Sequence, residues 1–411
     1  MNDSNTSQDD HLSVKWKQQE KHFFILSSSG KPIYSFHGDE LKLASIMGVI
    51  QAYLSFFIEE NDPLLSFKAG EHKFVFYIQG PLYLVAVSSL DESERVLTKQ
   101  LELLYAQVIF SVPIPQLNQI FDQHINFDLR NLLMGTDVLL NSLIKSFDQP
   151  WLFLESVRTM LISTKVKKSI SKAWNLAKPP KTLSFGMLIA NKKLVTLVQP
   201  KKHSLGFKDI ALIINLIYSS SSFRAVESWS PVCLAEFNSS GYLHCYSCFI
   251  TPDLCLVLLS VDKNAFFILS QFKRDFVQQL EDLRCVEPIE DLIKTDPINV
   301  VELGIPGLRH VIFKYRGVKC ITETNPIPPY TMPADQNRLY LMYQIAQSRL
   351  GKPYFGNMSF HITDSETVVL YKSTLFEIYA AFSPLIKKEV AHLAMWELGE
   401  WIQHRQDNFL L

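Results

Sequence analysis

The sequence predicts an α+β protein of three successive modules, each a five-stranded antiparallel sheet flanked by helices. One order of elements, two strands, a helix, three strands and a closing helix, can be traced three times along the 411 residues. Hydrophobic residues make up 47% of the chain, which is enough to give several domains their own cores. The expected division is a disordered N-terminus over residues 1–20, followed by modules at 21–150, 151–290 and 291–411.

The first module shows this order most clearly, because short apolar runs alternate with Gly and Pro turns. Its expected elements are strands at His22–Leu26 and Ile33–Phe36, a helix at Glu40–Glu60, strands at Leu64–Lys68, Lys73–Ile78 and Leu82–Ser88, and a helix at Glu92–Val112. Apolar residues at helical spacing should cover the module's own sheet; they are Leu43, Ile46, Met47, Ile50, Leu54 and Phe57. Val49, Tyr53 and Phe56 lie off that stripe and predict a second apolar face, unless neighbouring domains bury the helix on all sides.

The second and third modules repeat the order with different residues. The second is expected to have a helix or helix pair at Val157–Asn175, strands at Leu183–Ile189 and Leu194–Gln199 joined by an Asn191-Lys192 turn, a helix at Asp209–Tyr218, strands at Val232–Phe237, Tyr242–Ile250 and Leu254–Val261, and a helix at Lys263–Cys285. The third is expected to have strands at Leu308–Tyr315 and Val318–Thr322, a helix at Ala334–Arg349, strands at Phe360–Thr363, Thr367–Lys372 and Phe376–Phe382, and a helix at Lys387–Arg405.

Charge and composition exclude several classes of function. A net charge of −1 argues against a dedicated nucleic-acid binder, so protein partners are expected instead. The polar stretch Met1–Asp10 does not resemble a signal peptide, and no run of about twenty apolar residues is present to span a bilayer. The chain is therefore expected to be cytoplasmic and at most peripheral on a membrane, with its six cysteines reduced.

Catalytic and metal-binding motifs are sparse. The sequence contains no phosphate loop, no His-Glu-x-x-His zinc helix and no Gly-x-Ser-x-Gly elbow. Cys245 and Cys248 are spaced like metal ligands, but in a strand they point to opposite faces and are more simply explained as buried thiols. His72 has the chemistry of a general base, yet its place in a turn favours a surface or interface residue. No metal or cofactor is expected.

One segment has an unusual charge. From Ser156 to Lys208 there is no Asp or Glu, while twelve Lys and Arg residues accumulate. Two explanations remain open, a solvated face balanced by its neighbours in space and a contact with an anionic membrane. The membrane-binding candidates are Lys165, Lys167, Lys168, Lys172, Lys178 and Lys181.

A series of short sequence motifs resembles a known protein family. The motifs in question are Gly30-Lys31-Pro32-Ile33-Tyr34, Gly38-Asp39-Glu40, Met47-Gly48-Val49, Gln51-Ala52, Ser55-Phe56, Ala69-Gly70-Glu71-His72-Lys73-Phe74-Val75-Phe76 and Gly80-Pro81-Leu82-Tyr83-Leu84-Val85-Ala86-Val87-Ser88, followed by Leu129-Arg130, Leu132-Leu133, Trp229-Ser230-Pro231-Val232-Cys233-Leu234, Gly307-Leu308-Arg309-His310, Phe376-Glu377-Ile378-Tyr379 and Ser383-Pro384-Leu385. In this order and spacing they resemble the Mon-one (SAND) family of vacuolar fusion proteins. The resemblance runs from about residue 22 to the C-terminus and departs at the front, where the long acidic and Ser-rich region of the family is replaced by some twenty polar residues.

The resemblance implies both a fold and a function. It implies three longin domains and a heterodimer with a second longin protein, the calcium-caffeine-zinc sensitivity protein. It implies that this heterodimer is a guanine-nucleotide exchange factor for a late-endosomal, Rab-seven type GTPase, acting in endosome maturation and vacuole fusion. An early-endosomal Rab and an anionic phosphoinositide membrane are further expected partners. The alternative is a non-catalytic longin adaptor or tether in a trafficking or ciliary-polarity complex.

In such heterodimers the helix of the first domain belongs to the exchange surface, which here is Glu40–Glu60. Exchange needs no covalent chemistry, because tighter binding of the nucleotide-free GTPase is sufficient to lower nucleotide affinity. The candidate residues for the partner or the GTPase are Gly48, Val49, Gln51, Tyr53, Phe56, His72 and Lys73.

Overall fold

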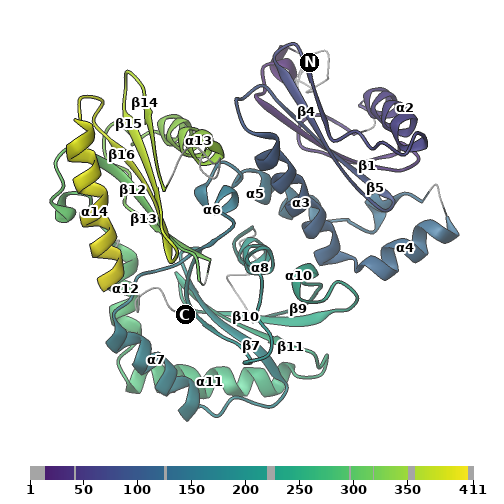
Figure 1. Cartoon of the computed structure of the whole chain (residues 1–411). Helices are drawn as coiled ribbons and strands as arrows, with labels where there is room; N and C mark the ends of the chain where they lie inside the picture. Colours follow the sequence, from purple (N-terminus) through teal and green to yellow (C-terminus); the bar gives the residue numbers. More distant parts are fainter. Residues whose placement is uncertain are drawn as a thin grey trace, which may run out of the picture. The chain divides into compact units, whose positions relative to one another are not determined.

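The computed structural model describes residues 14–40, 43–124, 127–219, 227–295, 298–317, 319–349 and 357–405. Three parts of the expectations therefore lie outside the described residues: positions 1–13 of the N-terminus, 41–42 of the first helix, and 318 at the start of a strand. The chain divides into two compact units, Met1–Phe147 and Asp148–Leu411 (Figure 1). One sheet lies in the first unit and two in the second, and all three share one core strand order, which confirms three copies of one topology.

The first unit holds an antiparallel sheet in the order β2-β1-β5-β4-β3. Its strands are β1 (Lys21–Ser27), β2 (Pro32–Ser35), β3 (Ser66–Ala69), β4 (His72–Gln79) and β5 (Leu82–Ser88). Its helices are α1 (Val14–Lys17), α2 (Ala44–Glu59), α3 (Glu94–Ser111), α4 (Ile114–Gln123) and α5 (Thr136–Ile144), with the 3-10 turn η1 (Leu129–Asn131). Helix α2 covers one face of the sheet, where Met47 and Leu54 pack with Phe76. Helix α3 covers the other face, and its Tyr105 ring lies 6.0 Å from the Tyr77 ring.

The short helix α1 falls within the segment expected to be disordered. Its Trp16 ring stacks on His22 at 4.0 Å, and the Trp16 indole donates a hydrogen bond of 3.1 Å to the His37 carbonyl. These contacts tie residues 14–17 to the sheet, so the expectation of disorder differs from the structure there.

The second domain holds a sheet in the order β8-β7-β11-β10-β9. Its strands are β7 (Leu183–Ala190), β8 (Lys193–Val198), β9 (Ser228–Val232), β10 (Leu243–Thr251) and β11 (Leu254–Ser260). Its helices are α7 (Thr164–Leu176), α8 (Phe207–Ser219), α10 (Ala235–Asn238), α11 (Phe266–Asp282) and α12 (Val286–Thr295). Asn191 and Lys192 both have left-handed φ angles, 44° and 63°, as a tight hairpin turn requires.

The expected strand Val232–Phe237 is wrong. The strand lies earlier, at β9, and the chain then turns into α10. The Asp209 carboxylate accepts hydrogen bonds from the backbone N–H groups of Glu236 and Phe237 at 3.2 and 2.9 Å, which satisfies the start of this short helix. Burial raises the pKa of Asp209 to about 7.

The third domain holds the strands β12 (Leu308–Tyr315), β13 (Cys320–Glu323), β14 (Met358–Ile362), β15 (Thr367–Lys372) and β16 (Phe376–Phe382). Its helices are α6 (Pro150–Phe153), α13 (Pro333–Arg349) and α14 (Lys388–His404), with the 3-10 turn η2 (Val301–Leu303). On the α13 side, His310 is buried among aromatic rings, and its Nδ1 lies 3.1 Å from the Tyr343 hydroxyl. Burial lowers the pKa of His310 to about 4.

The linker between modules corrects two expectations. Residues Val157–Arg158 form strand β6 rather than helix, and β6 pairs in parallel with β13, so the third sheet has six strands instead of five. The Thr159 N–H then donates to the Ile321 carbonyl at 2.9 Å, and the Met160 N–H donates to the Leu194 carbonyl of β8 at 2.9 Å. One extended segment therefore hydrogen-bonds to the edges of both sheets in the second unit.

Candidate functional site

Helix α2 has two apolar faces, as the sequence predicts. Its inner face buries Met47 and Leu54 against β1, β4 and β5. On its outer face Val49, Tyr53 and Phe56 are 70%, 49% and 63% exposed. The Tyr53 ring also contacts Phe57 and Phe67 edge to face, at centroid distances of 5.2 and 5.7 Å. The helix thus presents an aromatic surface supported from below by its own domain.

Gly48 and Gln51 have different roles in this surface. A Cβ atom added at Gly48 meets nothing within 4 Å, so the position is open to a close neighbour. Gln51 is engaged within the domain, because its amide donates to the Ser28 carbonyl at 3.1 Å and to the Ser55 hydroxyl at 2.9 Å. Gly30, with a left-handed φ of 78°, lies directly under the Gln51 side chain. Gln51 therefore fixes α2 to the first hairpin.

His72 and Lys73 are separated by the alternation of β4. Phe74 and Phe76 face α2, so His72, two residues before Phe74, belongs to that side, where it is exposed. Lys73 belongs to the α3 side, and its ammonium donates to the Glu92 carbonyl. The Glu92 carboxylate is itself buried and accepts hydrogen bonds from Lys21 at 2.9 Å and from Gln100 at 3.3 Å. The structure places His72, but not Lys73, on the same side of the sheet as the α2 surface.

The cysteines lie in the domain cores. All six are free and buried, and burial raises the pKa of Cys245 to about 12 and that of Cys233 to about 11. Such thiols stay protonated at neutral pH, which suits packing rather than nucleophilic attack. Across the residues that the structure describes, no group of three or more His, Cys, Asp and Glu side chains is placed to hold a metal ion.

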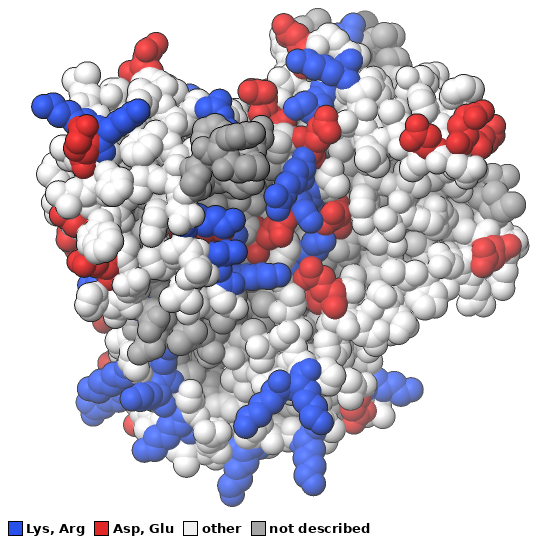
Figure 2. Space-filling view, viewed as in Figure 1, with Lys and Arg blue, Asp and Glu red and all other residues white. Residues whose placement is uncertain are grey.

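Helix α7 carries the basic segment on one face. Ile170, Ala173 and Trp174 pack into the core, while Lys165, Lys168 and Lys172 are exposed. A shallow hollow of about 550 Å³ runs along this face, and its lining comprises Thr164, Lys167, Lys168, Ser171, Lys172, Asn175, Leu176 and Thr196. Lys178 and Lys181, in the loop that follows, are also exposed. Figure 2 shows Lys and Arg gathered along the lower edge of the view, where Figure 1 places α7.

Part of the basic segment has internal acidic neighbours. The Arg158 guanidinium pairs with the Glu323 carboxylate and donates to the Gln149 side-chain oxygen at 2.9 Å. The Lys208 backbone N–H donates to the Glu236 carboxylate at 3.1 Å. The balanced-charge explanation therefore applies to the Arg158 end of the segment. Five exposed lysines lie on α7 and in the loop after it, and three more, Lys192, Lys201 and Lys202, follow later in the segment.

Sequence reasoning missed two exposed apolar groups. Phe267 and Ile268, at the start of α11, are 80% and 50% exposed, and Leu393 and Trp396 stand out from α14. The signal in the first case is the continuous apolar run Phe266–Leu269, which is longer than one helix face can bury. Among the described helices, none is both long enough and apolar enough to cross a bilayer.

Family comparisons match all three domains. Residues 21–143 match the first longin domain of FUZ, MON1 and HPS1, residues 181–278 match the second, and residues 307–406 match the third. These matches agree with the three sheets observed in the structure.

Relatives extend the similarity over nearly the whole chain. Protein SAND of Takifugu rubripes is 34% identical over 412 residues, covering 99% of this chain and 79% of the relative. The vacuolar fusion protein MON1 homolog A of Gallus gallus is also 34% identical, covering 99% and 75%. The vacuolar fusion protein MON1 of Yarrowia lipolytica is 31% identical over 404 residues, covering 96% and 74%. The chain therefore belongs to the MON1 (SAND) family of three-longin-domain vacuolar fusion proteins.

Proposed function

We propose that this chain is one subunit of a heterodimeric guanine-nucleotide exchange factor for a late-endosomal or vacuolar Rab GTPase. Its partner is a second longin protein of the calcium-caffeine-zinc sensitivity family. The observation that carries the proposal is the outer face of α2, where Val49, Tyr53 and Phe56 are exposed in a chain whose relatives are named vacuolar fusion proteins.

The energetics of the α2 surface favour a protein partner. Burial of apolar surface contributes roughly 25 cal/mol per Å², so three large side chains left in water represent unused binding free energy. Tyr is enriched among the residues that dominate interface energies. Gly48 lies one residue from Val49 and leaves room for a partner backbone to approach the helix closely.

Exchange is consistent with a surface that lacks a catalytic acid or base. An exchange factor binds the nucleotide-free GTPase more tightly than the loaded GTPase, and by reciprocity it lowers nucleotide affinity by the same factor. Rigid contacts to the switch regions are sufficient for this. Gln51 contributes by holding α2 in place, and His72 extends the α2 side of the sheet.

The test is co-expression with the longin partner, followed by release of labelled GDP from a panel of Rab proteins. Tyr53→Asp and Gly48→Arg are expected to abolish pairing and exchange while the chain still folds, because Tyr53 is 49% exposed and a Cβ added at Gly48 meets nothing within 4 Å. Gln119→Arg, at an exposed position on α4, is the matched control and should leave pairing intact. Normal pairing by both α2 variants would contradict this interface.

A second measurement separates a catalytic surface from a catalytic side chain. His72→Ala and Lys73→Ala should each reduce exchange by far less than the roughly hundredfold to ten-thousandfold loss typical of removing a general acid or base. A complete loss at either position, with GTPase binding intact, would mean that the side chain acts on the nucleotide or its magnesium. GTPase binding by the wild-type heterodimer without faster GDP release would instead identify a longin adaptor or tether.

We also infer that the exposed lysines of α7 contact an anionic membrane. Each Lys near a charged leaflet contributes about 1 kcal/mol, and several together hold a peripheral protein reversibly. Reversal of Lys165, Lys168 and Lys172 to Glu should lower binding to anionic vesicles and reduce its salt dependence, because exposed charges are screened over about 8 Å at physiological ionic strength. Exchange in solution should be unchanged. An equal loss of exchange and of vesicle binding would assign the lysines to the GTPase surface.

A further inference from the structure

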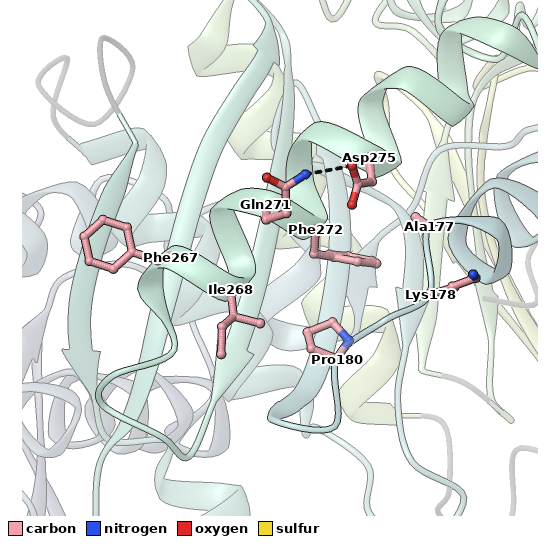
Figure 3. Close-up of a pocket in the computed structure, with 8 residues that line it drawn as sticks. All are labelled: Ala177, Lys178, Pro180, Phe267, Ile268, Gln271, Phe272 and Asp275. Carbon is pink, nitrogen blue, oxygen red and sulfur yellow. Dashed lines mark hydrogen bonds between the residues drawn. The ribbon is translucent and has the colours of Figure 1, made fainter.

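An open apolar hollow adjoins the C-terminal end of α7, next to the loop in which Lys178 and Lys181 are exposed. Helices α7 and α11 pack together on one face of the second sheet, where the Trp174 ring lies 5.0 Å from Phe272 and 5.2 Å from Phe276. Where α7 ends, a hollow of about 400 Å³ opens between the two helices. The residues that line it are Ala177, Lys178, Pro180, Phe267, Ile268, Gln271, Phe272 and Asp275 (Figure 3).

Two side chains at this hollow are not needed by the core. Leu269, Phe272, Phe276 and Leu280 form the inner stripe of α11 and are buried. Phe267 and Ile268 lie off that stripe and are largely exposed, and Figure 3 shows both side chains directed away from the helix. Val261, just before the helix, is also largely exposed. The domain thus presents bulky apolar groups that its own packing does not use.

The charges around the hollow indicate the kind of surface that covers it. Lys178 lines the hollow itself, and the stretch from Ser156 to Lys208 contains no acidic residue. Asp275 is the acidic residue of the lining, and its carboxylate accepts a hydrogen bond of 2.9 Å from Gln271. Exposed apolar groups beside exposed cations match an anionic bilayer, where cations meet the headgroups and apolar side chains enter the acyl boundary.

The type of cation favours lipid over protein. Of the twelve basic residues in the stretch, eleven are Lys, and the single Arg, Arg158, pairs with Glu323. Protein interfaces are enriched in Arg and depleted in Lys, whereas a diffuse anionic surface requires no fixed geometry from its cations. The exposed lysines of α7 are also spread along a 13-residue helix rather than gathered at one point.

We propose that Phe267 and Ile268 form an apolar anchor that inserts into an anionic bilayer beside the lysines of α7. This inference rests on the proposed membrane contact and adds the element that enters the lipid. The lysines supply a long-range attraction that salt weakens, and the anchor supplies a short-range apolar contribution that salt does not weaken.

The test compares three variants of the full chain on vesicles of phosphatidylcholine with and without phosphatidylserine. Phe267→Ser with Ile268→Ser should lower the partition coefficient at least tenfold on anionic vesicles, at low and at high salt. Reversal of Lys165, Lys168 and Lys172 to Glu should lower it strongly at low salt and weakly at high salt. Leu393→Ser with Trp396→Ser, at two exposed apolar positions on α14, is the matched control and should leave partitioning unchanged.

A direct readout makes the result independent of variant folding. Phe267→Trp keeps an aromatic side chain. The fluorescence that it adds to that of the six native Trp residues, measured as the difference from the unmodified chain, should shift to the blue on anionic vesicles and be quenched by brominated acyl chains. Unchanged partitioning of the double Ser variant together with no quenching would overturn the anchor, even where the lysine variant still loses binding. Loss of GDP release in solution by the double Ser variant would also overturn it, by placing the hollow in a protein interface. The variants on α2 should bind vesicles normally. The membrane anchor and the exchange proposal can therefore fail independently of each other.

Discussion

The helix after the first hairpin of each longin domain has the same topological place but very different burial. In α2, 11 of 16 residues are apolar, yet only Met47 and Leu54 are buried. In α8, seven of 13 residues are buried, and in α13 six of 17, although only eight residues of α13 are apolar. Helix α2 therefore has more apolar residues than α13 but buries fewer of its residues. This surplus of apolar surface distinguishes the first domain and suits contact with another chain.

In the second unit, the equivalent helices are covered by other parts of the same chain, and α8 contacts α10 and strand β6. The linker segment around Thr159 bonds to Ile321 in the third sheet, and Met160 bonds to Leu194 in the second. On α13, Tyr343 contacts His310, and the Tyr340 hydroxyl donates to Glu323 at 3.1 Å. These contacts belong to a folded core, whereas the outer face of α2 lacks comparable burial among the described residues.

The largest expected effect contrasts two tyrosines on equivalent helices. Tyr343→Ala should cost about 3–5 kcal/mol of unfolding free energy, because Tyr343 is 0% exposed and its removal leaves a cavity. Tyr53→Ala should cost about 1 kcal/mol or less, since Tyr53 is 49% exposed. Both costs are measured by urea unfolding, followed by hydrogen exchange of peptides from each unit. This measurement does not assume that the two units unfold in a single transition. Equal costs would show that the α2 surface is part of the domain core.

The next effect tests the segment shared by the two sheets of the second unit. Thr159→Pro removes the N–H that donates to the Ile321 carbonyl at 2.9 Å and should cost about 1–3 kcal/mol. Protection from hydrogen exchange should fall at the edges of β8 and β13. Thr159→Val retains the N–H and serves as the control. Unchanged protection in the Pro variant would mean that the two sheets do not depend on this segment.

Acid should affect the three domains differently. The folded pKa of His310 is about 4, below its unfolded value of 6.5, so the unfolded state binds more protons between these values and stability falls as pH drops through them. At pH 5 the third domain should lose about 2 kcal/mol relative to pH 7. His22 should weaken the first domain in the same direction, because burial also lowers its pKa to about 4.

Asp209 should act oppositely in the second domain. Its folded pKa of about 7 lies above its unfolded value of 3.8, so the folded state binds more protons between these values and gains stability as pH falls.

The acid effect of His310 is tested in the third domain alone, by hydrogen exchange of β12 and β16 at pH 7 and pH 5. His310→Gln should remove most of the acid effect there. An acid effect of full size in that variant would assign it to groups other than His310.

Local patterns were sufficient for most of the fold. The strands Leu82–Ser88, Thr367–Lys372 and Phe376–Phe382 have the predicted bounds, since alternation and turn residues are read within a few positions. Strand β6 and helix α10 escaped prediction because long-range contacts stabilise them. Arg158 meets a carboxylate 165 residues away, and the caps of α10 come from Asp209, some 27 residues earlier.

The candidate site was predictable to a similar extent. The exposure of Val49, Tyr53 and Phe56 follows from helical spacing and is confirmed. The internal hydrogen bonds of Gln51 required tertiary structure. Strand alternation predicts that Lys73 and His72 point to opposite faces of the sheet. Which of the two faces is covered by α2 depends on the tertiary structure and could not be predicted from the sequence. The role of each residue in binding a partner or a GTPase stays a prediction.

The smallest expected effect concerns the glycine in the middle of α2. Glycine in a helix interior costs roughly 0.5–1 kcal/mol relative to Ala, and a Cβ at Gly48 meets nothing within 4 Å, so Gly48→Ala should stabilise the isolated chain by about that amount. Gly186 in β7 is the contrasting position, because its Cβ would lie 2.0 Å from the Trp174 ring, and Gly186→Ala should destabilise the second domain. If a partner backbone packs against Gly48, the stabilised Ala variant should nevertheless pair more weakly in titrations with the longin partner. Tighter or unchanged pairing would show that no backbone approaches the helix there, and would move the contact toward Tyr53 and Phe56.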